Sequence, residues 1–242
     1  MAVYNKALSA ARIVAHYAAV DVPEPPAYQQ AVVADNPVAY WRMNEEYGAA
    51  GNPSYANSLG SAYINSGSDG YYDIGDASGS DIGAAGLRVA NSANNRRGDD
   101  NLAVHFDGVN DCIKVNDNAD FRLSGALTIE AWIKPDAGHG TGWILSKYDT
   151  AGNQRSHFLQ VSSTGIIGFG VSNDGTWDYS TGWLTSDSAV PDGQWTHVAG
   201  VFEPNQFMRI YINGIEDIAK LSNLEPGLNA SSTADVYVGC YY

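Results

Sequence analysis

Residues 193–218 constrain the fold most, because their sequence, GQWTHVAGVFEPNQFMRIYINGIEDI, predicts two strands and both of their turns. Trp195 to Phe202 is rich in aromatic and β-branched residues and is followed by the turn residues Glu203-Pro204-Asn205. From Met208 to Ile212 the apolar residues recur with the two-residue period of a strand, and Asn213-Gly214 fits a type I′ turn. A meander of this kind is not stable alone, so the chain must supply a second apolar face to cover it.

Composition agrees with an all-β domain and excludes two classes of partner. The chain has 242 residues with 26 glycines and 15 tyrosines, and only 17% of its residues are charged, which is typical of a turn-rich β protein. Its net charge of −14 argues against nucleic acid and anionic membranes as partners, since both require a basic face. There is no apolar run of the roughly 18 residues that a membrane span requires, and no signal-peptide pattern at the start, so we expect no membrane insertion.

The N-terminal part predicts a division into three segments. Val3-Tyr4 resembles the end of a strand, and Ser9 is placed to cap a short helix over residues 10–17. The three prolines of residues 21–27 favour an extended linker, so residues 1–20 form one unit and residues 28–242 another. Residues 45–101 are predicted to form a long surface loop with short strands near 62–64 and 87–90.

Regular strands return from Leu102 onward. The expected strands cover residues 103–106, 112–115, 127–134, 143–148, 158–161, 166–171 and 236–240, besides the two already described. Many short strands separated by turn signals predict an all-β, two-sheet antiparallel sandwich with a short N-terminal helix.

Five strand motifs carry a family resemblance. AVHFDGVNDCIKV, LTIEAWIKP, GQWTHVAGVFE, MRIYINGIE and VYVGCYY occur in that order over residues 101–242, and VVADNPVAYWRMNE precedes them. Together they resemble the laminin-G-like, concanavalin A-like jelly-roll modules of bacterial and phage surface proteins. The resemblance implies two curved antiparallel sheets and a role in adhesion, glycan recognition or structural repetition.

The chain departs from the resembled modules at its end. Such modules continue past VYVGCYY with a closing strand and a short helix, whereas here AVYNKALSAARIVAHYAA at the start resembles that ending. We therefore expect residues 1–18 to complete the sandwich of a neighbouring copy or an adjacent repeat by strand addition. The residues expected to make this contact are Val3, Tyr4, Leu8, Ile13 and Tyr17. An arbitrarily cut segment is the alternative explanation.

The sequence gives little evidence for catalytic residues. Glycoside hydrolases on this architecture need two carboxylates a few residues apart on one strand face, but Glu130 has no such partner. Glu216 and Asp217 are adjacent, so they point to opposite faces. His105 and His197 lie within expected strands, where a structural role is favoured over catalysis, and the other three histidines fall in the N-terminal helix or in or beside loops. No nucleophile elbow or phosphate loop is present. We expect a protein that is not an enzyme.

Two binding sites are predicted with unequal support. Asp107 and Asp111 bracket a turn where calcium could bind, although local hydrogen bonding of the turn is about twice as probable an explanation. The stretch from residue 173 to 183 combines aromatic and short polar side chains, a pattern typical of sugar binding, and Trp143 could join it. Its candidate ligand-binding residues are Asn173, Asp174, Trp177, Tyr179 and Trp183. The same aromatic residues could instead fill the core or a subunit interface.

The remaining features leave alternatives open. Cys112 and Cys240 could form a disulfide or remain buried thiols, and the RGD tripeptide at residues 97–99 is too short to predict a receptor. The main hypothesis is a structural or adhesive repeat of an extracellular filament or phage appendage, at a cell surface or on a virion, with copies of itself as partners. The alternative is a lectin-like carbohydrate-binding module that binds glycans and has no assembly role.

Overall fold

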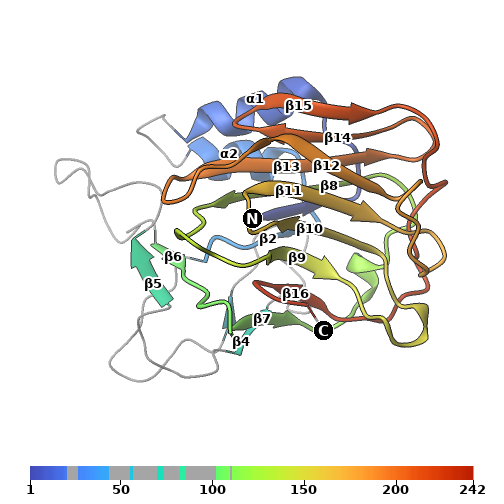
Figure 1. Ribbon diagram of the computed structural model, residues 1–242, viewed down its shortest axis with the longest axis horizontal. Coiled ribbons are helices and arrows are strands. Elements are labelled where there is room, and N and C mark those ends of the chain that lie inside the picture. The colour runs from blue at the N-terminus through green and yellow to red at the C-terminus, as the bar shows by residue number, and fades with distance from the viewer. Residues whose placement is uncertain are drawn as a thin grey trace.

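The chain folds as two antiparallel β-sheets packed face to face, with two helices on the outside of one sheet (Figure 1). A computed structural model describes residues 1–20, 27–43, 55–56, 70–73, 82–85, 102–109 and 111–241. The proline segment at 21–26, the strands expected near 62–64 and 87–90, and the RGD tripeptide lie outside the described residues. The predicted all-β jelly-roll sandwich with a short N-terminal helix is confirmed.

One sheet has six strands. In spatial order they are β15 (Ile215–Lys220), β14 (Phe207–Ile212), β13 (Thr196–Glu203), β8 (Leu127–Ile133), β1 (Ala2–Tyr4) and β2 (Ala39–Tyr40). The predicted meander is present, since β13, β14 and β15 are consecutive antiparallel neighbours. Asn213 and Gly214 have φ angles of 50° and 78°, as the tight turn between β14 and β15 requires.

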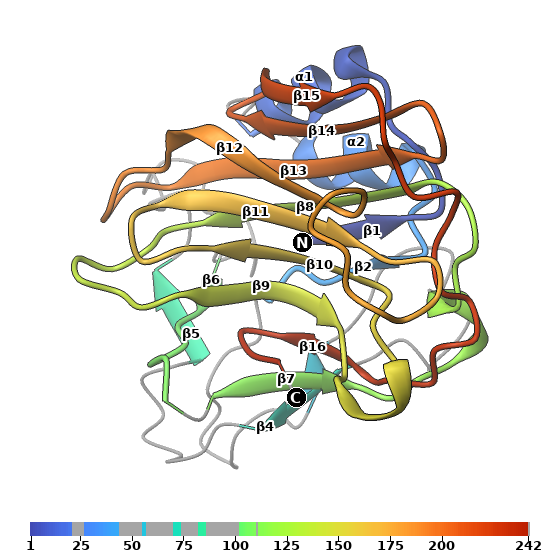
Figure 2. The same ribbon diagram turned by 45° about the vertical axis from the view of Figure 1, so that its right-hand side comes forward.

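The other sheet has eight strands. They are β12 (Trp183–Ala189), β11 (Ile166–Val171), β10 (His157–Val161), β9 (Gly142–Lys147), β16 (Val236–Val238), β7 (Cys112–Val115), β4 (Gly70–Asp73) and β3 (Tyr55–Ala56). A separate pair joins β5 (Ile82–Ala85) to β6 (Leu102–Val104). Figure 2 shows β9 to β12 as adjacent strands that curve together across this sheet.

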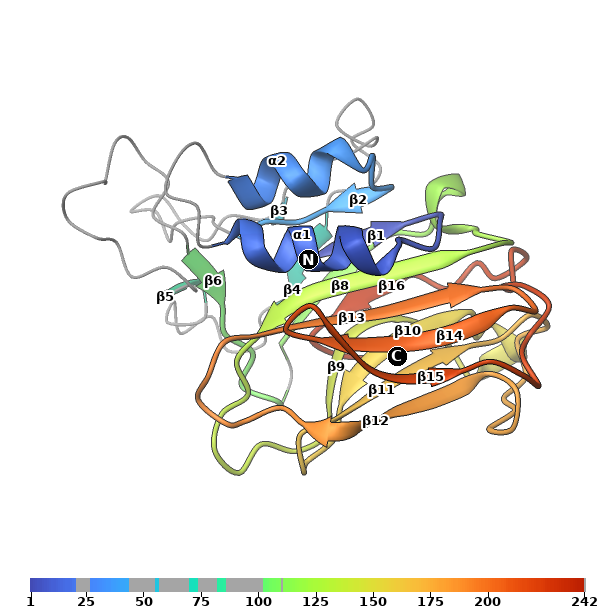
Figure 3. The same ribbon diagram turned by 90° about the horizontal axis from the view of Figure 1, so that it is seen from above.

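Alternation along the strands separates two apolar layers. In β1, Val3 enters the core between the sheets, where it joins side chains such as Ile129 and Phe169. A second cluster lies on the outer face of the six-stranded sheet and consists of Ala2, Tyr4, Leu8, Ile13, Val32, Tyr40, Ala199, Val201 and Tyr211. Helices α1 (Ala10–Ala19) and α2 (Ala27–Ala34) cover this cluster, as Figure 3 shows. Both faces of β13 are therefore buried, which explains its unbroken buried run from Thr196 to Phe202.

The N-terminal strand closes the sandwich of its own chain. β1 pairs with β8 in the register Ala2↔Glu130 to Tyr4↔Thr128, and with β2 on its other side. The Ser9 side chain accepts a hydrogen bond from the Arg12 amide and caps α1 as predicted. β1 thus occupies, within its own chain, the strand position that was expected to be filled by a neighbouring copy.

This arrangement contradicts the expected donation of residues 1–18 to a neighbouring copy. Val3, Tyr4, Leu8 and Ile13 are buried in the two apolar layers of the same chain. Tyr17 stacks on Trp132 of β8 with ring centroids 5.7 Å apart. The prediction failed because strand motifs identify which strand is displaced in sequence, but not which copy of the chain supplies it.

A buried ionic network holds α1 against the sheet. The Glu130 carboxylate is completely buried and lies 3.0 Å from Nδ1 of His16 and 3.3 Å from Nε2 of His197, and it accepts a 2.7 Å hydrogen bond from the Tyr4 hydroxyl. The other His16 nitrogen, Nε2, lies 2.9 Å from Oδ2 of Asp35. Both nitrogens of His16 face acceptors, so both carry protons and the ring is an imidazolium. Asp35 Oδ2 also pairs with Nε of Arg12 at 2.6 Å.

The network shifts two pKa values in opposite directions. Burial alone would raise the pKa of Glu130, but hydrogen bonds and charge from His16 and His197 outweigh it and hold the pKa below 4.5. Burial alone would lower the pKa of His16, but the hydrogen bond and charge of Glu130, followed by the charge of Asp35, raise it above 6.5. Each partner therefore stabilises the charged form of the other.

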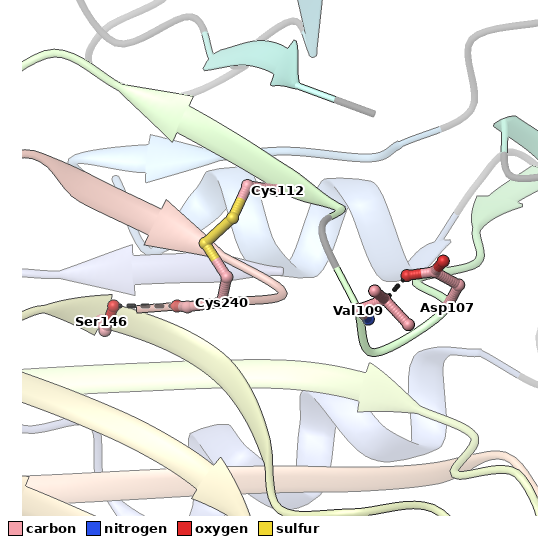
Figure 4. Close-up of a disulfide and its surroundings, with 5 residues drawn as sticks. All are labelled: Asp107, Val109, Cys112, Ser146 and Cys240. Atoms are coloured by element: carbon pink, nitrogen blue, oxygen red, sulfur yellow. Dashed lines mark hydrogen bonds between the residues drawn. A yellow bond between two sulfur atoms is a disulfide. The ribbon is translucent and has the colours of Figure 1, made fainter. Parts of the chain in front are cut away.

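A disulfide joins two neighbouring strands of the eight-stranded sheet. Cys112 begins β7 and Cys240 follows β16, and their Cα atoms are 5.5 Å apart (Figure 4). The Ser146 hydroxyl of β9 donates a 3.0 Å hydrogen bond to the Cys240 carbonyl, as Figure 4 also shows. The open question of a disulfide or two thiols is answered in favour of the disulfide.

The ionic network predicts a pH window of greatest stability. The Glu130 contribution is complete above pH 4.5 and is lost as the pH falls through its lower folded-state pKa. The His16 contribution is complete below pH 6.5 and is lost as the pH rises through its higher folded-state pKa. Glu130→Gln should therefore cost most between these two limits, by about 3–5 kcal/mol, because it leaves the buried imidazolium without its partner.

Urea unfolding of the wild type and Glu130→Gln, measured in parallel from about pH 3 to pH 9, checks this expectation. Glu203→Gln, at the half-buried end of β13, is the matched control and should show a small difference at every pH. A free-energy difference for Glu130→Gln that is equally large at all pH values would contradict the ionic account.

The disulfide predicts a second loss of stability. Replacing Cys112 and Cys240 together by serine should lower the free energy of unfolding by about 2–4 kcal/mol, because the unfolded chain gains freedom across the 128-residue separation. Urea unfolding with and without a phosphine reductant measures it. The reductant should destabilise the wild type and leave the double variant unchanged; equal stability of all four samples would show that the bond contributes nothing.

Candidate ligand-binding site

Aromatic rings gather on the outer face of the eight-stranded sheet. Core residues of β10 and β11 such as Leu159 and Phe169 point toward the other sheet, so the alternate positions face away from it. Phe158, Gly170 and Trp183 are register partners on β10, β11 and β12, and they share that outer face. We define the aromatic platform as the connected rings of Trp143, Tyr148, Phe158, Trp177, Tyr179, Trp183 and Tyr241.

Phe158 is the centre of the platform. Its ring is only 2% exposed, and its centroid lies 4.8 Å from that of Trp143, 5.1 Å from that of Trp177 and 5.3 Å from that of Trp183. The ring centroid of Tyr148, the fourth surrounding residue, lies 5.7 Å from that of Phe158. The four surrounding rings are half-buried, so they are held in place by Phe158 while keeping part of their surface open.

Two tyrosines form the exposed ends of the platform. Tyr241 is 55% exposed, and its ring centroid lies 4.7 Å from that of Trp143. Tyr179 is 71% exposed, and its centroid lies 5.4 Å from that of Trp177. Because Trp143 is on β9 and Trp183 on β12, the platform crosses four strands, a distance of about 14 Å at the usual strand spacing.

Two glycines in β11 let the rings lie close to the sheet. A Cβ atom at Gly170 would come within 2.4 Å of the Phe158 ring and 2.5 Å of Trp177. A Cβ atom at Gly168 would come within 2.9 Å of Trp183. The absence of side chains at these positions is therefore needed for the observed ring packing.

Hydrogen bonds fix the loop that carries Trp177 and Tyr179. The Arg155 guanidinium donates from Nη1 to the Gly175 carbonyl and from Nε to the Tyr148 hydroxyl, both at 3.1 Å. At the far end of the loop, the Thr181 hydroxyl donates to the Glu225 carboxylate at 2.5 Å. Gly182 also exchanges backbone hydrogen bonds, donating to Asp178 and accepting from Val171. The loop is thus held in position by bonds to the rest of the protein.

The acidic residues of the loop are turn-forming carboxylates. Hydrogen bonds from the Thr176 side chain and amide lower the pKa of Asp174, whose Oδ1 accepts them at 2.7 and 2.8 Å. Hydrogen bonds from Ser180 likewise lower the pKa of Asp178. Both carboxylates are exposed anions at neutral pH, and Asn173 is exposed beside them.

The structure brings together most of the predicted ligand-binding residues. Trp177, Tyr179 and Trp183 are in mutual ring contact, Trp143 reaches them through Phe158, and Asp174 orders the turn that precedes them. Whether they bind a ligand stays a prediction. Sequence reasoning missed Phe158, Tyr148 and Tyr241. The glycines at alternate positions of β11, opposite an aromatic residue in β10, are the signal that could have indicated them.

The predicted calcium residues bond to the backbone of their own turn. Oδ1 of Asp107 accepts from the Val109 amide at 2.7 Å, as Figure 4 shows, and Oδ2 of Asp111 accepts from the Asp107 amide at 2.9 Å. Within the described residues, no group of three or more histidine, cysteine or carboxylate side chains is arranged to hold a metal. Calcium binding here stays an untested expectation.

Comparison with known proteins identifies one family match. The model of the concanavalin A-like lectin/glucanases superfamily matches residues 107–242, more than half of the chain. No curated protein matches the sequence. None of the helices in the described part of the chain is long and apolar enough to cross a membrane.

Solved structures align at low similarity. The CBM40 domain of a Ruminococcus gnavus sialidase, bound to α2,3-sialyllactose, aligns at 21% identity and a TM-score of 0.38 over 49% of this chain and 64% of that one. A structure of botulinum neurotoxin type C, whose cell entry depends on two ganglioside molecules, aligns at 12% identity and a TM-score of 0.39 over 54% of this chain and 31% of that one. This chain thus covers less than two thirds of either protein, and the alignments carry no argument about its ligand.

The close packing of aromatic rings against Gly170 of β11 predicts the effect of a single added methyl group. Gly170→Ala should displace the Phe158 and Trp177 rings and lower the free energy of unfolding by about 1–3 kcal/mol, with a change in tryptophan fluorescence of the folded protein. Gly125→Ala is the matched control, because nothing lies within 4 Å of its Cβ position. Identical fluorescence and stability for the two variants would show that the rings do not rest on β11.

Proposed function

The chain belongs to the concanavalin A-like lectin/glucanase superfamily, and we propose that it is a glycan-binding module whose aromatic platform holds the ligand. The observation that carries this proposal is the connected set of half-exposed rings around Phe158. Aromatic faces bind the C–H surfaces of sugars, and short polar side chains beside them bind hydroxyl groups. Exposed polar side chains lie on both sides of Trp177 in the sequence: Asn173, Asp174 and Thr176 precede it, and Asp178 follows it directly.

Preorganisation supports binding at this face. The platform loop is fixed by Arg155, Glu225 and backbone hydrogen bonds, so a ligand needs to order few side chains. The free energy of association is then less reduced by lost conformational entropy. On the six-stranded sheet, α1 and α2 cover the apolar cluster of the outer face (Figure 3), so these residues are closed to a ligand.

A role without catalysis fits the positions of the carboxylates. A glycosidase needs one carboxyl group with a raised pKa to act as general acid. Asp174 and Asp178, which flank the exposed rings, both have lowered pKa values. Glu130 is buried under α1 and bonded to His16, so it cannot reach a substrate.

The disulfide supports a location outside the cell. Disulfides form and persist in oxidising compartments and are rare in the cytosol. The bond between Cys112 and Cys240 therefore favours an extracellular or cell-surface module.

Trp177→Ala should abolish glycan binding while the protein remains folded. The indole is half-buried and contacts Phe158, Trp183 and the exposed Tyr179, so its loss removes the ring that joins this end of the platform to Phe158. A glycan array followed by calorimetric titration of the best ligand measures the loss, and circular dichroism checks the fold. Trp195→Ala, a half-buried tryptophan outside the platform, is the matched control and should bind as the wild type does. Absence of binding by the wild type to every glycan would refute the proposal.

A further inference from the structure

We infer that the platform takes a single, uncharged glycan chain free in solution, in preference to a crystalline polysaccharide surface or an anionic glycan. This inference rests on the proposed function and specifies its ligand. Three observations carry it: the angles between the rings, the charges beside them and the extent of the platform across the strands.

The rings do not share a plane. Trp177 is inclined by 86° to Tyr179 and by 78° to Trp183, and Trp143 is inclined by 60° to Phe158. Even the two most nearly parallel pairs of the platform, Phe158 with Trp177 and Trp143 with Tyr241, differ by 30° and 34°. A crystalline polysaccharide presents a flat array of chains, so it could contact only one or two of these rings at a time. A single flexible chain can turn from ring to ring and contact several of them.

The charges beside the rings disfavour an anion. Asp174 and Asp178 are exposed, and hydrogen bonds hold both pKa values below the ordinary range, so both carry negative charge. Among the described residues, two cations near these rings, Arg155 and Lys220, are directed to protein acceptors. Arg155 donates to the Tyr148 hydroxyl and the Gly175 carbonyl, and Lys220 donates to the Ser180 carbonyl. A carboxylate or sulfate on the glycan would therefore meet the like charge of Asp174 and Asp178, while Arg155 and Lys220 are already bonded to the protein.

The extent of the platform indicates more than one sugar ring. The exposed tyrosines Tyr179 and Tyr241 are at opposite ends of a platform that crosses the four strands β9 to β12, a width of about 14 Å. A monosaccharide on Trp177 would leave Tyr241 unused. We therefore expect affinity to rise with the number of neutral sugar units until the platform is filled.

The experiment compares matched glycans. An array presents neutral oligosaccharides of increasing length and the same oligosaccharides carrying a terminal sialic acid or sulfate, and a parallel sedimentation assay uses microcrystalline cellulose. We expect neutral oligosaccharides to bind, charged counterparts to bind about fivefold or more weakly, as one exposed like-charge contact predicts, and cellulose to retain no protein. Asp174→Asn with Asp178→Asn should bring the charged members closer to their neutral partners, because asparagine keeps the turn hydrogen bonds and removes the charge.

The outcomes separate this inference from the proposed function. Equal or stronger binding of the charged glycans, or retention on cellulose, with loss of binding in Trp177→Ala, would overturn the inference and leave glycan binding in place. Binding that survives Trp177→Ala, or no binding to any glycan, would overturn both. Both proposals are supported if neutral oligosaccharides bind more tightly than charged ones, if this binding is lost in Trp177→Ala, and if the difference in affinity between neutral and charged glycans is smaller in the double asparagine variant.

Discussion

The contact between Glu130 and His16 is the interaction on which the rest of this fold depends. A carboxylate with no exposure is costly unless it is paired, and its partner here comes from α1, far away in sequence. The pair therefore requires α1 to lie on the outer face of β8, and the short strand β1 that precedes α1 is brought between β8 and β2. Once both helices are in place, the outer sides of Ala199 and Val201 are also removed from water. Ion pairing thus specifies the position of the N-terminal segment, and apolar burial supplies most of its stability.

The parts of the fold that depend on local pattern were predictable from the sequence. The bounds of β7 and β11 agree with the strands expected from alternation, and Ser9 caps α1 as its residue type suggests. What could not be predicted is the pairing of distant segments. The motif order showed that the closing strand is displaced to the N-terminus, but the same pattern fits closure of the chain on itself or of a neighbour. The decisive residue, Glu130, looked isolated because its partners His16 and His197 are separated from it in sequence by 114 and about 67 residues, and only the sheet brings them together.

The aromatic platform shows the same division between local and long-range information. Trp177, Tyr179 and Trp183 are close in sequence, so the sequence alone indicates an aromatic cluster there. Phe158 was read as part of a strand, and its place on the outer face follows from the register that sets it opposite Gly170 and Trp183. Tyr241 reaches Trp143 because β16 lies beside β9 and the adjacent Cys240 is bonded to Cys112. Strand order and the disulfide, rather than any local motif, therefore determine the length of the platform.

The outer faces of the two sheets differ because the helices α1 and α2 cover only one of them. On the six-stranded sheet, helices and a paired buried carboxylate occupy the outer surface, and the aromatic residues there, such as Tyr4 and Tyr211, are buried. On the eight-stranded sheet neither α1 nor α2 covers β9 to β12 (Figure 3), and the glycines in β11 let large rings pack close to the strands without entering the core. Rings supported from below by Phe158 and held by Arg155 keep their open faces without collapsing onto one another. An exposed aromatic surface is costly in water unless a ligand covers it, and a fixed, tilted arrangement restricts which ligands can. In the function proposed here, the fixed arrangement of the rings would therefore be the physical basis of selectivity.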